Sequence, residues 1–239
     1  MTSIRDDKGY NQGFRPSKAL TIRTERRCAY MIGKMRLDQK IKIMEIGCGT
    51  GELANLLAQK TEQQVLGIDI CRTFIDQAKE DYRRPNLSYD VLDFNDDKSF
   101  GQFFQDKKFD YIVGNGVLHH FFYNLDDVLK KIHTLLNEDG KIIFLEPNIF
   151  NPYCFSIFKL AYLRKIARLE PGEMAFSKKF ITAKLISSGF IDPEVEYKDF
   201  LLPNIPAFLI RPSIVLGQLL EKVPLLRMVS QSIFISARK

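Results

Sequence analysis

Short apolar runs alternate with amphipathic segments along most of the chain. The runs are rich in Ile, Val, Leu and Phe, and several are apolar on both faces, as strands of a covered parallel sheet are. They predict five strands, over residues 41–46, 64–70, 87–92, 109–114 and 141–146. The segments between them predict helices, over residues 51–60, 72–82 and 125–140, with Gly140 as the C-cap of the last.

The order of these elements predicts the fold class. Strands that alternate with helices are joined by right-handed crossovers and form a parallel sheet covered on both faces. We therefore expect a doubly wound α/β fold. Two insertions interrupt the alternation, at about residues 148–176 and 203–228, before a last strand within 232–239.

Composition refines the domain organisation. The chain has 239 residues, 45% of them hydrophobic, enough for one large core. Its net charge of +6 lies within residues 1–40, which hold ten Lys/Arg against four Asp/Glu. We expect a basic helical lid over 1–40 and a single domain over 41–239. A basic arm also suits nucleic acid or an anionic membrane, but a solvated helix is the simpler interpretation, and no nucleic-acid partner is expected.

Cysteine spacing and hydropathy bear on cell compartment. The four cysteines form no C-x-x-C pair, which argues against a metal site or a disulfide framework. No apolar signal segment opens the chain, and the most apolar stretch, residues 205–220, contains Arg211 and Pro212. It falls short of the ~20 residues that a membrane-spanning helix needs. We expect a cytoplasmic protein without transmembrane segments, with peripheral membrane contact and the choice between monomer and homodimer left open.

A glycine-rich turn follows the first expected strand, in "IKIMEIGCGTGELA". Gly47, Gly49 and Gly51 stand at alternate positions, and such strand-to-helix turns commonly bind nucleotides. No Walker sequence is present. A dinucleotide fingerprint is G-x-G-x-x-G, and here the third glycine comes one residue early.

Acidic residues stand at or near the ends of three successive strands. Glu45 precedes the glycine turn, and a buried carboxylate there needs a cation or hydrogen-bond donors. Asp69 ends the second strand, where a carboxylate can accept both hydroxyls of a ribose. Asp93 follows the third strand with Phe94 beside it, a pair suited to an adenine amino group and ring. Each acid, taken alone, is equally suited to a helix cap.

The ordered series "MEIGCGTG", "GIDI", "LDF", "FDYIVGNGVLHHF" and "LNEDGKIIFLEPN" resembles the motifs of class I S-adenosylmethionine-dependent methyltransferases. The resemblance covers roughly residues 41–147. It implies a seven-stranded sheet whose last strand is antiparallel and inserted beside the sixth. It also implies that S-adenosylmethionine is the cofactor, with its methionine part at the glycine turn, and that the turn needs no phosphate-binding Lys or Arg.

The resemblance further implies roles for individual residues. Backbone around the methionine part would come from Gly47, Cys48 and Gly49, and Glu45 would brace the loop. The remaining cofactor contacts would be Asp69 and Ile70 at the ribose, Asp93 and Phe94 at the adenine, and Asn115 and Gly116 beside the amino-acid part and the methyl. The side chains that could reach the cofactor carboxylate from the N-terminal helix are Tyr10, Phe14, Arg23, Arg26 and Arg27.

Methyl transfer needs a protein base only if the acceptor must lose a proton. His119 and His120 follow the fourth strand and are the candidates, although we favour a packing or capping role for both. The "NGVL" sequence there resembles small-molecule and lipid-intermediate methyltransferases, including the quinone-biosynthesis group. Aromatic residues in the insertions favour a moderately apolar acceptor. A nicotinamide-dependent oxidoreductase and a catalytically silent relative remain the alternatives.

Overall fold

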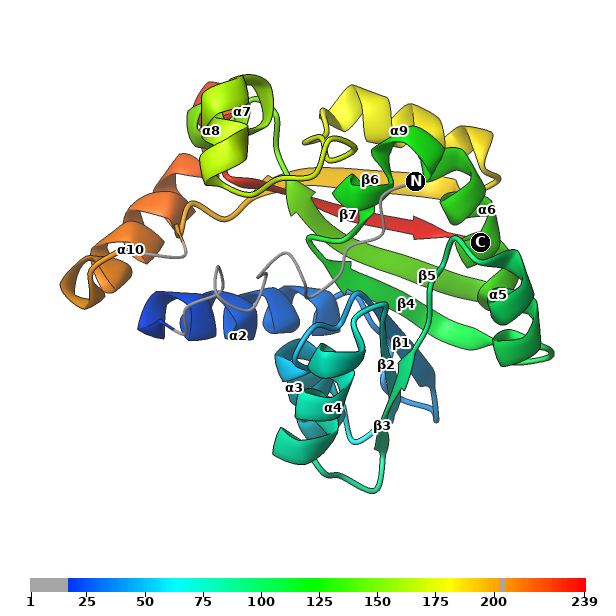
Figure 1. Cartoon of the computed structure of the whole chain (residues 1–239). Helices are drawn as coiled ribbons and strands as arrows, with labels where there is room; N and C mark the ends of the chain where they lie inside the picture. The colour runs from blue at the N-terminus through cyan, green and yellow to red at the C-terminus, as the bar shows by residue number, and fades with distance from the viewer. Residues whose placement is uncertain (1–16, 203–204) are drawn as a thin grey trace.

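The computed structural model describes residues 17–202 and 205–239 (Figure 1). Seven strands form one sheet in the order β3-β2-β1-β4-β5-β7-β6. The strands are β1 (Lys42–Ile46), β2 (Gln64–Asp69), β3 (Leu87–Val91), β4 (Phe109–Asn115), β5 (Leu136–Pro147), β6 (Ile191–Lys198) and β7 (Ser232–Arg238).

The strand directions confirm the expected topology. The first five strands are parallel to one another, while β7 lies between β5 and β6 and is antiparallel to both. Strand β1 pairs with β2 on one side and β4 on the other, so the strand order reverses at β1. Ligands of open α/β sheets bind beyond the carboxyl ends of the strands at such a reversal.

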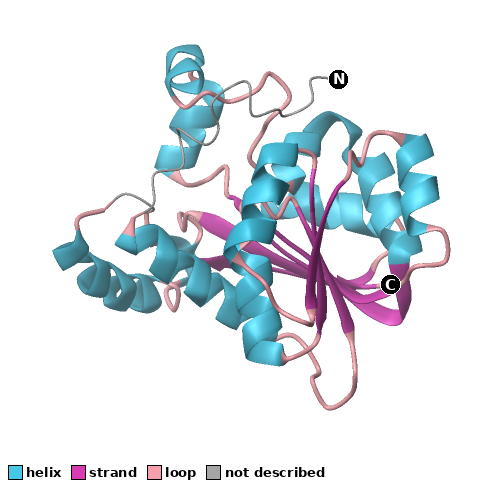
Figure 2. Ribbon diagram, turned by 60° about the horizontal axis from the view of Figure 1, so that its bottom comes forward, coloured by secondary structure: helices cyan, strands magenta, loops and turns pink. Residues whose placement is uncertain are grey.

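Helices cover both faces of the sheet (Figure 2). One face carries α2 (Lys18–Ile32), α3 (Glu52–Thr61) and α4 (Arg72–Asp81). The other carries α5 (Asp97–Phe104), α6 (Leu125–Leu135) and α9 (Lys178–Ser187).

The alternation along β1 explains the two layers. Successive side chains of a strand point to opposite faces. Ile43 packs in the cluster that contains α3, whereas Met44 and Ile46 pack in the cluster that contains α6. A strand apolar on both faces is therefore buried from both sides, as its sequence predicts.

The predicted end of the helix over residues 125–140 was wrong. Helix α6 ends at Leu135, and Gly140 lies within β5 and is not a C-cap. Leu136 is extended and buried, and it pairs with Phe109 of β4. Burial of this leucine in the sheet ends the helix, and the residues that follow, Asn-Glu-Asp-Gly, do not favour its continuation.

Both insertions are helical. The first contains α7 (Pro152–Lys159) and α8 (Ala161–Ile166), and the second contains η3 (Ala207–Leu209), α10 (Ile210–Leu220) and α11 (Pro224–Arg227). Within the part of the chain that the structure describes, no helix is long and apolar enough to cross a lipid bilayer.

The N-terminal helix α2 is a packed part of the sheet's covering layer. Its Cys28 and Met31 are fully buried in the same cluster as α3. Tyr10 and Phe14, two of the candidates for the cofactor carboxylate, lie outside the described residues. The division at residue 40 into a lid and a domain stays a prediction.

Candidate active site

The glycine turn between β1 and α3 is held against β2. Gly47 and Gly49 have φ angles of 67° and 52°, in the left-handed region that glycine adopts most easily. A Cβ on Gly47 would lie 2.5 Å from the Val117 Cγ2 atom. A side chain at this position would therefore push apart the turn and the loop after β4.

Asp69 fixes the turn from the end of β2. Its Oδ2 accepts a hydrogen bond from the Gly49 amide at 2.9 Å, and its Oδ1 accepts one from the Cys71 amide at 2.9 Å. Burial raises the pKa of Asp69, and these two hydrogen bonds act in the opposite direction. Each carboxylate oxygen keeps a further lone pair for a ligand hydroxyl.

Gly51 allows the Tyr89 side chain to pack closely against the turn. Its φ is 87°, and a Cβ there would lie 2.6 Å from the Tyr89 hydroxyl oxygen. That hydroxyl donates to the Gly51 carbonyl at 3.0 Å. The early third glycine thus lets β3 approach the start of α3, which explains its departure from the dinucleotide spacing.

A cavity opens beyond the carboxyl ends of β1, β2, β3 and β4. Eight of the predicted cofactor residues line it: Gly47, Gly49, Asp69, Ile70, Asp93, Phe94, Asn115 and Gly116. Its other lining residues are Ile46, Ile68, Phe74, Leu92, Asn95, Val117, His120 and Phe121. No Lys or Arg occurs among the described lining residues. The cavity therefore suits a nucleoside without phosphates better than a dinucleotide.

Glu45 and Cys48 do not line the cavity. Glu45 is 2% exposed. Burial, and the charges of Glu52 and Asp69, raise the pKa of Glu45 well above its usual range. The Ala54 amide is its donor, and no cation pairs with it among the described residues. Cys48 is buried, and burial also raises the pKa of its thiol.

The aromatic side chains around the cavity differ in part from those expected. The Phe94 ring is buried, with ring centroids 5.1 Å from Phe100 and 6.1 Å from Phe104, so most of it belongs to the core. Phe74 and Phe121 line the cavity and were not anticipated. Phe74 stands in the first turn of α4, five residues after Asp69, and that position is the signal that could have found it.

Among the three candidate arginines of α2, Arg27 forms a hydrogen bond with a residue that lines the cavity. Its Nη1 donates to Asn115 Oδ1, its Nε to Asp199 Oδ2 at 3.2 Å and its Nη2 to Ser232 Oγ at 2.6 Å. Arg23 also pairs with Asp199, at 3.3 Å. Arg26 donates to the hydroxyl of Tyr30. None of the three arginines lines the cavity, and Arg27 acts on it by orienting Asn115.

His119 is held behind the cavity, in the 3₁₀ helix η2 (Leu118–Asn124). Its Nδ1 lies 2.9 Å from Glu146 Oε2, and the side chain is 10% exposed. Glu146 Oε1 also accepts from the amides of Val117 and Leu118, at 3.0 and 2.8 Å. These contacts match a histidine that braces the loop after β4.

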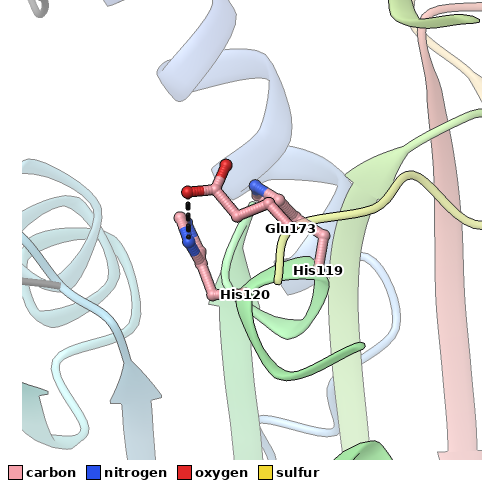
Figure 3. Close-up of side chains that lie close together, drawn as sticks. All are labelled: His119, His120 and Glu173. Atoms are coloured by element: carbon pink, nitrogen blue, oxygen red, sulfur yellow. Dashed lines mark ion pairs between the residues drawn. The ribbon is translucent and has the colours of Figure 1, made fainter. Parts of the chain in front are cut away.

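His120 differs because it lines the cavity and faces a second buried carboxylate. Its Nδ1 lies 3.2 Å from Glu173 Oε1, and Figure 3 shows this carboxylate facing the ring. Burial and the neighbouring His119 lower the pKa of His120. Burial acts to raise the pKa of Glu173, but its hydrogen bond and charge interaction with His120 outweigh this and bring it to about 2. We conclude that Glu173 is ionised.

Glu173 was missed by sequence reasoning. It lies 53 positions after His120, within the first insertion, and no motif spacing links the two. Nitrogen and oxygen atoms of His119, His120 and Glu173 lie within 4.8 Å of one another, a grouping that can hold a metal ion. Here each histidine already pairs with a carboxylate. The expectation that no metal is bound stays a prediction.

Comparisons with known proteins agree with this geometry. A family model described as "Methyltransferase domain" matches residues 44–142. Malonyl-[acyl-carrier protein] O-methyltransferase from Acetivibrio thermocellus is 26% identical over 160 residues, covering 65% of this chain and 53% of that protein. Ubiquinone/menaquinone biosynthesis C-methyltransferase UbiE from Desulfotalea psychrophila is 23% identical over 184 residues, covering 69% of this chain and 70% of that protein.

Solved structures agree on the fold. A SAM-dependent methyltransferase from Archaeoglobus fulgidus superposes with a TM-score of 0.65 at 18% identity, covering 96% of this chain and 98% of that one. Residues 44–142 are thus similar to a methyltransferase domain, and the chain has the fold of a SAM-dependent methyltransferase. The oxidoreductase alternative gains no support. The chain spans about half the length, or less, of several curated relatives.

Proposed function

We propose that this protein is an S-adenosylmethionine-dependent methyltransferase that acts on a small, partly apolar acceptor. One observation carries the proposal. The cavity at the sheet's switch point is lined by two carboxylates and by His120, and by no Lys or Arg among the described residues. S-adenosylmethionine suits such a lining because it has no phosphate and its sulfonium is positive.

The proposed cofactor site uses the strand ends. Asp69 is held by two backbone amides, and this fixed carboxylate supports a role in accepting the hydroxyls of a ribose. The hydrogen bond from Arg27 orients Asn115, which supports its proposed contact with the amino-acid part of the cofactor. Gly49 has nothing within 4 Å of where its Cβ would be, which leaves room for a ligand against its backbone. When bound, S-adenosylmethionine supplies an activated methyl group.

The proposed acceptor site lies at His120. A neutral His120 with its Nδ1 proton toward Glu173 keeps Nε2 as the basic atom. Glu173 positions the ring and stabilises the imidazolium that forms when Nε2 takes a proton. We therefore propose that the nucleophilic atom of the acceptor carries a proton, as in a phenol, an alcohol or an activated carbon acid. His119 has the bracing role that its contacts with Glu146 support.

Two relatives bear on the acceptor class. One is named for a malonyl-[acyl-carrier protein] and the other for ubiquinone/menaquinone biosynthesis. Phe158 of the first insertion packs on His119, with ring centroids 5.8 Å apart, so apolar side chains stand close to this side of the cavity. These observations support an acceptor with an apolar part. We also propose a cytoplasmic location, since no described helix is suited to span a membrane.

Release of S-adenosylhomocysteine tests the proposal. The protein would be incubated with S-adenosylmethionine and a panel of phenols, β-dicarbonyl compounds and carboxylates carrying short or long alkyl chains. We expect acceptor-dependent release with a phenol or a carbon acid, and loss of release in His120→Gln. Cofactor binding without turnover on any acceptor would instead indicate a catalytically silent relative.

A further inference from the structure

The exposed apolar side chains of this protein are concentrated in the two insertions. Sixteen of the 21 large apolar side chains that the described residues expose lie within residues 150–166 and 208–229. Tyr162, Phe208 and Leu225 are 76%, 77% and 79% exposed. Monomeric proteins rarely expose contiguous apolar patches of this extent without a binding role. We call the surface of residues 150–168 and 205–229 the insertion face.

The two insertions meet in space. Asn148 Nδ2 donates to the Met228 carbonyl at 2.9 Å, and Asn151 Nδ2 donates to the Val229 carbonyl at 2.7 Å. The start of α7 is therefore joined to the end of α11. Figure 1 shows α7, α8 and α10 at the same end of the sheet, beyond the carboxyl ends of the parallel strands. The exposed apolar residues of the insertion face therefore belong to one end of the molecule.

Folding of the domain does not account for most of the apolar residues of α8, α10 and α11. Helices α8 and α11 have no buried residue, and α10 has only Ile210 and Gly217. Short helices are marginal in water unless an apolar face is packed against something. The composition of the insertion face is thus better explained by an external apolar phase than by the core.

The charge of the insertion face is positive. Residues 150–168 contain Lys159, Arg164, Lys165 and Arg168 and no acid. Residues 205–229 contain Arg211, Lys222 and Arg227 against Glu221, which accepts a hydrogen bond from the Asp199 amide at 2.9 Å. All of these basic side chains except Arg164 are exposed. Lys and Arg around exposed aromatic and aliphatic residues are typical of helices that lie in a membrane interface.

We propose that the insertion face docks on a bilayer that contains anionic lipids. The basic side chains would meet lipid headgroups, while Tyr162, Phe208 and Leu225 would enter the acyl boundary. A second copy of this chain fits less well because a two-fold interface would bring the same cations together. Anionic lipid matches both the apolar area and the charge.

Docking would also place the acceptor side of the cavity near the bilayer. This inference about the acceptor rests on the proposed function. Phe158 of α7 packs against His119, and Arg164 Nη1 of α8 donates to the Glu173 carbonyl at 3.0 Å. The insertion that would meet the bilayer is therefore the one that holds the His120–Glu173 pair. A docked protein would receive its acceptor from the lipid phase.

Vesicle co-sedimentation tests the docking. The full chain would be mixed with phosphatidylcholine vesicles, with and without phosphatidylglycerol, at low and high salt. We expect sedimentation with the anionic vesicles, weakened by salt. Tyr162→Glu and Leu225→Glu should each lower the partition coefficient about tenfold or more, because each loses an inserted apolar side chain and adds a repelled charge.

Ile186→Glu is the matched control, since Ile186 is 59% exposed on α9, outside the insertion face. Its partition coefficient should stay within about twofold of the wild type. An equal loss in this control, or no sedimentation of the wild type, would overturn the proposal. So would a dimer in light scattering that Leu225→Glu dissociates. Calorimetry with S-adenosylmethionine on the same variants separates the docking proposal from the proposed methyltransferase function. If the protein binds vesicles but not the cofactor, only the proposed function is rejected.

Discussion

Two walls meet at the cavity, and they are built in different ways. The strand-end wall consists of Gly47, Gly49, Asp69 and Asp93, which lie at the ends of adjacent parallel strands. The histidine wall consists of His120 and, behind it, Glu173. The first wall depends on backbone amides and φ angles, and the second depends on side chains from segments far apart in the chain.

The difference explains what each wall can recognise. Asp69 accepts from two amides that any sequence with this turn would present, so the strand-end wall suits a ligand that many proteins share. The histidine wall depends on where the first insertion places Glu173. We infer that the strand-end wall serves the common cofactor and the histidine wall serves the acceptor particular to this protein.

The largest expected effect comes from His120→Gln. If His120 is the base, the turnover number should fall by about 10²–10⁴-fold, while cofactor affinity stays within about twofold. Single-turnover kinetics and calorimetry measure the two quantities. His119→Gln should lower stability more than turnover. Normal turnover in folded His120→Gln would show that His120 is not a base and would support the packing role that the sequence favours.

The pH–rate profile sharpens this assignment. A base is active only when deprotonated, so activity should be lost as pH falls through the pKa of His120. That pKa is lowered by burial and by His119, which puts the acid limb below the reference value of about 6.5. Glu173→Gln removes a carboxylate that raises the pKa of His120, so the limb should move to still lower pH. A limb that does not move contradicts the pairing.

A large stability effect is expected at Asp199. Its carboxylate is 1% exposed and pairs with Arg23 and Arg27. Asp199→Ala leaves buried cations without their partner, which typically costs about 3–5 kcal/mol of unfolding free energy in urea titrations. Asp192→Ala, which breaks an exposed pair with Arg238, is the matched control and should cost at most about 1 kcal/mol.

Acidification gives a second readout for Asp199. Burial acts to raise its pKa, but Arg27 and Arg23 outweigh this and lower it. A carboxyl whose folded pKa is lowered contributes stability above its unfolded pKa of about 3.9, and loses it as pH falls through the folded pKa. The wild type should therefore lose more stability than Asp199→Ala below about pH 4. Equal losses would show that the ion pairs contribute nothing.

A smaller effect is expected at the strand-end wall. Asp69→Ala removes the proposed ribose contacts, and charge-assisted hydrogen bonds are worth roughly 1.5–3 kcal/mol each. The affinity for S-adenosylmethionine should fall at least about tenfold in calorimetry. Asp90→Ala, at an exposed position on β3, should leave it unchanged. An unchanged affinity in folded Asp69→Ala would remove Asp69 from the cofactor site.

The smallest effect is expected at Cys48. Its side chain is buried and does not line the cavity. Cys48→Ala should therefore leave cofactor affinity within about twofold in the same calorimetric titration, although the protein loses some stability. A tenfold loss of affinity would show that the Cys48 side chain supports the turn at the ligand.

The sequence predicts the strand-end wall well because local rules determine it. Apolar runs locate β1 and β2, and the residues that follow parallel strands must lie at one edge of the sheet. It does not predict the histidine wall, because the pairing of His120 with Glu173 depends on how the first insertion folds back. It also places the end of α6 too late, since burial of Leu136 against β4 is a tertiary effect.

Isothermal titration calorimetry with three ligands tests the central claim most directly. The same protein preparation would be titrated with S-adenosylmethionine, S-adenosylhomocysteine and NAD. The cavity carries two acids and no Lys or Arg among its described lining residues, so we expect both sulfur ligands to bind at low micromolar concentration or tighter and NAD to give no heat of binding. Binding of NAD with no response to either sulfur ligand would contradict the account.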